Sequence, residues 1–171
     1  MHKLAQLPIV VALAMALPLG CGKKDDTEAK AEAVKVLPEA SNGSPLAVEL
    51  VEFIGEGEER GMKVRLYNHG DKTAAGAMLL FRYYDASDKL LKVKPGTAFE
   101  SDSDFTSISG GRYKCEAKKN ATFELDGRML AVPADAARVE ILASKVSALA
   151  ADGNTIEDWW SQENFSDWPE G

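Results

Sequence analysis

The sequence predicts a mainly β fold, an antiparallel β-sandwich over residues 46–156. Two observations predict it. Apolar and polar residues alternate with a period of two in several short segments, and turn sequences rich in Gly, Asn and Asp separate these segments. About seven such segments favour two stacked sheets over a barrel or an α/β sheet. With 171 residues, of which 45% are hydrophobic, the chain is long enough for one such domain with flanking segments.

The first strands are expected to form a hairpin. Residues 46–50 and 62–67 both alternate between apolar and polar side chains, and the polar, glycine-containing loop 55–61 lies between them. After a turn at 68–72, the segment 74–84 is apolar on both faces. A strand that is covered on both faces belongs in the middle of a sheet, so we predict that 74–84 is a central strand.

The second half of the domain is predicted to contain four further strands. Residues 90–94 form one, and 112–118 pairs with 119–126. The segment 138–149 is open to two interpretations, because its apolar residues also recur at helical spacing. We prefer a strand, since a bulge near Leu142 would preserve the alternation and a hairpin turn follows.

The first 20 residues resemble a signal peptide. Lys3 provides a basic start, and residues 4–19 are almost wholly apolar. An apolar helix of about 16 residues rises about 24 Å, short of the roughly 30 Å hydrocarbon core, so a lasting membrane span is disfavoured. The sequence Leu-Pro-Leu-Gly-Cys at 17–21 then resembles the lipobox of bacterial lipoproteins, although the family prefers Leu where Pro18 stands.

This resemblance implies cleavage between Gly20 and Cys21, followed by lipidation of Cys21, which makes the membrane the first partner. Gly22 follows the cysteine, and in this family Asp at that position can retain the product in the inner membrane. The resemblance therefore favours the outer membrane. The alternative is an ordinary secretory peptide with an incidental cysteine. Residues 21–45 are hydrophilic apart from a few apolar groups and are predicted to be the lipidated cysteine and a flexible tether.

The charge of the chain excludes some partners. The net charge is −7, and the part from Cys21 onward is one unit more negative because Lys3 is the only charged residue before it. Nucleic acid requires a clustered basic face, so we expect no nucleic-acid partner. Cys115 would have no disulfide partner once Cys21 is lipidated. We expect Cys115 to be a buried small hydrophobic residue, and the alternative is a reactive thiol.

Two short segments resemble a family of bacterial exported modules. The turn Asn-His-Gly-Asp-Lys at 68–72 and the aromatic strand end Phe-Arg-Tyr-Tyr-Asp at 81–85 are similar to immunoglobulin-like modules of the FxLYD type. Those modules usually have Gly after the Asp, where Ala86 stands here. The resemblance implies an immunoglobulin-like sandwich that serves as a folded spacer or interaction module. The family has no common enzyme activity to carry over.

No catalytic or cofactor motif stands out. His69 is the only histidine after the leader, so a Cys115–His69 pair is the one nucleophilic arrangement available, and nothing in the sequence brings these residues together. Carboxylates at 102–104 and at Asp85 and Asp88 lack the spacing of a calcium loop. We expect solvated turn residues there, and therefore no metal and no cofactor.

The C-terminal tail, residues 157–171, contains all three tryptophans: Trp159, Trp160 and Trp168. In an extended chain the first two point to opposite faces. The tail is predicted to fold back over an edge or an open end of the core. The alternative is an aromatic contact with a protein or glycan partner. The sequence favours a non-catalytic interaction or envelope-assembly module. A ligand-binding lipoprotein that uses the tail is the second hypothesis, and an envelope hydrolase is the last.

Overall fold

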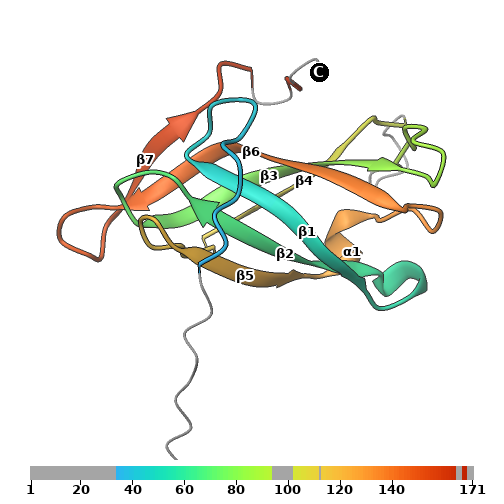
Figure 1. The fold of residues 1–171 in the computed structure, drawn as a ribbon, viewed down its shortest axis with the longest axis horizontal. Coiled ribbons are helices and arrows are strands. Elements are labelled where there is room, and N and C mark those ends of the chain that lie inside the picture. The colour runs from blue at the N-terminus through green and yellow to red at the C-terminus, as the bar shows by residue number, and fades with distance from the viewer. Residues whose placement is uncertain (1–33, 94–101, 112, 165–166, 169–171) are drawn as a thin grey trace, which may run out of the picture. The chain divides into compact units, whose positions relative to one another are not determined.

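The computed structural model describes residues 34–93, 102–111, 113–164 and 167–168. The predicted leader, with Gly20 and the predicted lipidation site Cys21, lies outside the described residues. Residues from Ala33 onward form one compact unit, in which two antiparallel sheets face each other (Figure 1). The mainly β sandwich predicted from the sequence is therefore confirmed.

The first sheet contains three strands: β1 (Leu46–Ile54), β2 (Gly61–Asn68) and β5 (Asn120–Leu125). Their order is β1-β2-β5. The predicted hairpin is confirmed, because β1 and β2 pair antiparallel across a loop that contains the short 3-10 helix η1 (Gly57–Glu59).

The second sheet has the order β4-β3-β6-β7. Its strands are β3 (Ala74–Tyr84), β4 (Thr106–Gly110), β6 (Arg138–Leu149) and β7 (Ile156–Ser161), and the one-turn helix α1 (Gly127–Leu130) precedes β6. As predicted, β3 is central, with β4 on one side and β6 on the other.

The core lies between the two sheets and follows the alternation in the sequence. One face of each inner strand is apolar and packs against the other sheet, as expected for a sandwich. The largest fully buried side chains include Tyr83, Phe81, Leu46, Met62, Leu66 and Leu79.

The strand preferred for residues 138–149 is confirmed, and its bulge lies two residues beyond the predicted place. Lys145 pairs with Met78 and Ala143 pairs with Leu79, so Ser144 is the extra residue. Ile141 and Ala143 before the bulge, and Val146 after it, then all face the core. The bulge resolves the apparent helical spacing, because one inserted residue shifts the period-two pattern by one position.

Two predicted strands are wrong. In the predicted strand 90–94, the described residues 90–93 make only isolated bridges, Leu90 to Tyr84 and Val93 to Ser103. In the predicted strand 112–118, the described residues 113–118 contribute a single bridge, between Cys115 and Ala74.

The pairing predicted for the strand at 119–126 was also wrong. Strand β5 pairs with β2 and not with 112–118. A turn separates the two segments, with Lys118 in the left-handed region at φ 58°. Tyr113 and Cys115 are buried, which explains the misleading alternation. Strand β4 was missed because Ile108 is its only large apolar residue.

Residues 34–45, assigned to the tether from their composition, pack against the sandwich. Leu37 is buried and forms a small cluster with Ala47 and Tyr67. The Nδ2 atom of Asn42 donates to the carbonyl oxygen of Ala143 and to Oε1 of Gln162, both at 2.9 Å. The folded domain therefore begins near residue 34, and only residues 22–33 separate it from Cys21.

Candidate functional site

The tail begins as part of the sheet. Strand β7 pairs with β6, and the register shifts between Trp160, which pairs with Val146, and Asp158, which pairs with Ser147. Trp159 is thus the extra residue of a β-bulge. Both Trp159 and Trp160 are partly buried and pack against the core cluster. Opposite faces were expected for an extended chain, but the bulge at Trp159 interrupts the extended alternation and both rings contact the core cluster.

Trp168 lies away from this cluster, over the outer face of β3. The guanidinium carbon of Arg82 is 4.6 Å from the centre of the Trp168 ring, which is a cation–π contact. The Nε atom of Arg82 is buried and has no hydrogen-bond partner among the described residues. The tail therefore covers an arginine whose donors are not all used.

Arg82 and Trp168 line a groove of about 800 Å³ at the seam between the two sheets. This size is within the range of about 300–1,000 Å³ that is typical of ligand sites. Three parts of the chain form its walls: the segment from Leu37 to Ser41, the β1 residues Ala47 to Glu49, and the β6 residues Val139 to Leu142. We call this cavity the seam groove.

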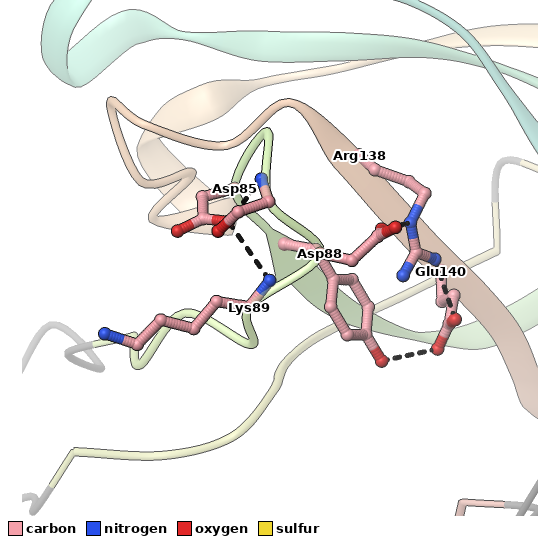
Figure 2. Close-up of polar contacts among 7 residues, drawn as sticks. Asp85, Asp88, Lys89, Arg138 and Glu140 are labelled. Atoms are coloured by element: carbon pink, nitrogen blue, oxygen red, sulfur yellow. Dashed lines mark hydrogen bonds and ion pairs between the residues drawn. The ribbon is translucent and has the colours of Figure 1, made fainter.

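A network of charged and aromatic groups forms one end of the seam groove. Glu140 accepts hydrogen bonds from the Tyr84 hydroxyl at 2.7 Å and from Nη1 of Arg138 at 2.8 Å. Arg138 also donates to Asp88 at 2.8 Å, so it joins the two carboxylates (Figure 2). Its guanidinium carbon lies 3.9 Å from the centre of the Tyr84 ring.

The electrostatics of this network keep Glu140 ionised. Burial alone would raise its pKa, but hydrogen bonds from Arg138, Tyr84 and Trp168 outweigh burial and leave the pKa below its ordinary value. The pKa of Tyr84 is raised, first by burial and then by its hydrogen bond to the Glu140 carboxylate. Glu140 is thus a fixed anion whose oxygens are already engaged.

The structure does not assemble Cys115 and His69 into a nucleophilic pair. The Cys115 side chain is buried, as predicted, and its Sγ donates to the carbonyl oxygen of Lys119 at 3.2 Å. Burial raises the pKa of the thiol to about 11, which disfavours the thiolate. The His69 ring packs edge-on against Tyr67, with the ring centres 4.6 Å apart.

Three of the carboxylates considered as calcium ligands, Asp85, Asp88 and Asp104, instead stabilise a turn or form ion pairs. The Asp85 carboxylate accepts hydrogen bonds from the Ser87 hydroxyl and from the backbone N–H groups of Lys89 and Ser87, and these bonds lower its pKa. Figure 2 shows the bond to Lys89. Asp88 pairs with Arg138, and Asp104 pairs with Lys92. Among the described residues, no three His, Cys, Asp or Glu side chains gather into a metal-binding group.

Sequence reasoning identified Trp168 as a candidate contact and missed Arg82 and Glu140. A signal was present: Arg82 is the one charged residue in the segment 74–84, which is otherwise apolar on both faces. A charge within such a strand marks a place where the outer face is open to solvent or to a partner.

Comparisons with known proteins add little. No family model matches the sequence, and no curated protein matches it. One solved structure, titled "X-ray structure of Northeast Structural Genomics Consortium target SoR45", aligns over 66% of this chain and 76% of that chain, with 9% identity and a TM-score of 0.25. Within the described residues, none of the helices has the length and apolar character needed to cross a membrane.

Proposed function

We propose that this protein is an extracytoplasmic lipoprotein, anchored through lipid on Cys21, that displays a non-catalytic interaction domain. The single observation that carries the proposal is the arrangement of the chain: an apolar leader ending in a lipobox-like sequence, a short hydrophilic stretch, and a folded β-sandwich from residue 34 onward. This order is expected of a module tethered to a membrane surface.

The packing of residues 34–45 sets the reach of the tether. Residues 22–33 are left to connect the lipid to the domain, and twelve fully extended residues span at most about 40 Å. The domain would be held close to the bilayer. Such a location suits binding to another envelope component.

Three features of the connections support an immunoglobulin-like assignment within the sandwich class. The chain crosses from one sheet to the other between β2 and β3, between β4 and β5, and between β5 and β6. Crossings of this kind are shared with the Greek-key connections of immunoglobulin-like domains.

The second candidate function is ligand binding by the tail. The contact that favours it is Trp168 over Arg82, which lies at the seam groove and not in the core. Trp159 and Trp160, in contrast, pack against the core and support a structural role for the first part of the tail.

Metabolic labelling with a palmitate analogue tests the anchor. We expect label on the wild-type protein and on Cys115→Ala, and none on Cys21→Ala. The Cys115→Ala variant is a matched control because it removes the only other cysteine. Sucrose-gradient fractionation should then place the labelled protein with the outer membrane. Recovery of the protein from the cytosol with its leader intact would refute the proposal.

A further inference from the structure

The seam groove lies beside two strand edges that are not covered by another strand. Strand β1 is the edge of its sheet, since it pairs only with β2. Strand β6 pairs with β7 only from Lys145 onward, so its first half has no strand on that side among the described residues. Exposed strand edges present backbone N–H and C=O groups, which an extended peptide can pair with.

Arg82 supplies a guanidinium at this place, and its buried Nε atom has no hydrogen-bond partner among the described residues. The other four arginines in the described part of the chain each donate to a carboxylate or to carbonyl oxygens: Arg60, Arg65, Arg128 and Arg138. Within that part, Arg82 has a ring contact with Trp168 and an electrostatic interaction with Tyr84, and its buried Nε atom has no hydrogen-bond partner. A guanidinium presents five donors in a planar fork that matches a carboxylate.

Two of the three carboxylates in the groove lining are held by other donors. Glu140 stands directly opposite Arg82 in the β3–β6 register, and its oxygens accept from Tyr84, Arg138 and Trp168. Glu49, on the β1 wall, accepts from Lys35 and Arg65 and its pKa is lowered chiefly by the Lys35 hydrogen bond. The remaining acidic group of the groove lining, Glu39, is exposed.

We propose that the seam groove binds an extended peptide that places a carboxylate on Arg82, next to Trp168. This inference deepens the proposed function, because it assigns the partner class of the interaction domain. We prefer a peptide to a sugar because the exposed strand edges offer backbone groups for pairing. Arg138 already occupies one face of the Tyr84 ring, and Arg82 occupies one face of the Trp168 ring.

Two peptides test the carboxylate. Both are seven residues long and alternate Val and Thr, with blocked ends, and they differ only in a central Glu or Gln. Titration into the isotopically labelled mature protein is followed through backbone and Trp indole N–H resonances. We expect saturable shifts at β1, β6 and Trp168, with at least tenfold weaker binding of the Gln peptide.

Matched variants test the arginine. Arg82→Gln should reduce the preference for Glu over Gln to about one, while Arg128→Gln removes the same charge from an exposed pair with Asp126 and should leave the preference unchanged. Arg82→Lys should give an intermediate preference, because it keeps the charge and loses the fork. The comparison of the two peptides on the wild-type protein needs no variant, so it holds even if Arg82→Gln fails to fold.

Several outcomes would overturn the inference. These are equal binding of the two peptides, an unchanged preference in Arg82→Gln, no saturable shift with either peptide, and a response to sodium glucuronate in place of the peptides. The last would assign the site to an acidic sugar. None of these results affects the lipid labelling of Cys21, so failure of this inference and failure of the anchoring proposal are separate observations.

Discussion

The indole ring of Trp159 lies against Gly70, so close that a Cβ atom added at position 70 would stand 2.2 Å from Cη2 of the ring. This contact joins the bulge of β7 to the turn that follows β2. The contact therefore holds the start of the tail against the domain, and a side chain at position 70 would require the Trp159 ring to move.

Gly70→Ala should destabilise the domain by about 1–3 kcal/mol, because the ring must move out of a packed site. Urea unfolding measures the loss. Gly111→Ala is the control, since a Cβ there meets nothing within 4 Å, and it should change stability by less than about 0.5 kcal/mol. Trp159→Leu combined with Gly70→Ala should recover part of the loss. Strictly additive effects of the two changes would contradict the contact.

Asn68→Ala should cost about 2–4 kcal/mol. The Asn68 side chain is fully buried, its Nδ2 donates to the carbonyl oxygens of Lys72 and Cys115, and its Oδ1 accepts from the N–H of Gly70. Loss of the amide removes the side-chain partner of the Gly70 N–H and of the Lys72 carbonyl oxygen, and one of the two hydrogen bonds to the Cys115 carbonyl oxygen, which Ala74 N–H also contacts. Asn154→Ala, in an exposed turn, is the comparison and should cost far less. Equal midpoints of urea unfolding for the two variants would be inconsistent with this role.

The domain should lose stability between pH 10 and 12. Burial raises the pKa of Tyr83 from its ordinary value of 10 to about 12. Below pH 10 the hydroxyl is protonated in both the folded and the unfolded chain, so the stability is fully present. Above pH 10 only the unfolded chain ionises, and at about 1.4 kcal/mol for each pH unit the loss reaches about 2–3 kcal/mol.

Tyr83→Phe isolates this effect. The variant removes the hydroxyl contacts to Thr106 and to the carbonyl oxygen of Leu130, and should be about 1 kcal/mol less stable at neutral pH. Its stability should fall less steeply above pH 10 than that of the wild type. Parallel curves for the two proteins would show that Tyr83 does not titrate as described.

Cys115 should be unreactive in the folded protein. The side chain is 1% exposed and its pKa is raised to about 11, so both access and the thiolate form are suppressed. In a Cys21→Ala background, 5,5′-dithiobis(2-nitrobenzoate) should label Cys115 only in denaturant. Rapid labelling under native conditions at neutral pH would contradict burial.

Much of the sandwich could be predicted because its strands are patterned locally. In residues 62–67 and 74–84, the order of side chains along the chain indicates which faces of each strand are covered. The structure confirms these segments as β2 and β3. The failures occurred where burial comes from distant contacts. Cys115 alternates with its neighbours as a strand residue would, yet in the described part of the segment its bridge to Ala74 is the one β-bridge.

The sequence by itself determined the order of the parts: an apolar N-terminal segment, a hydrophilic stretch and a domain of alternating strands, because hydrophobic periodicity is a property of the chain alone. Only the tertiary structure decided that Trp159, at a bulge, and Trp160 both pack against the core, and that Trp168 lies over Arg82 at the seam groove. Bulges and seams depend on which strands pair and in which register. Such pairings join residues that are far apart in the chain. Their contribution to stability therefore cannot be inferred from the periodicity of a local segment.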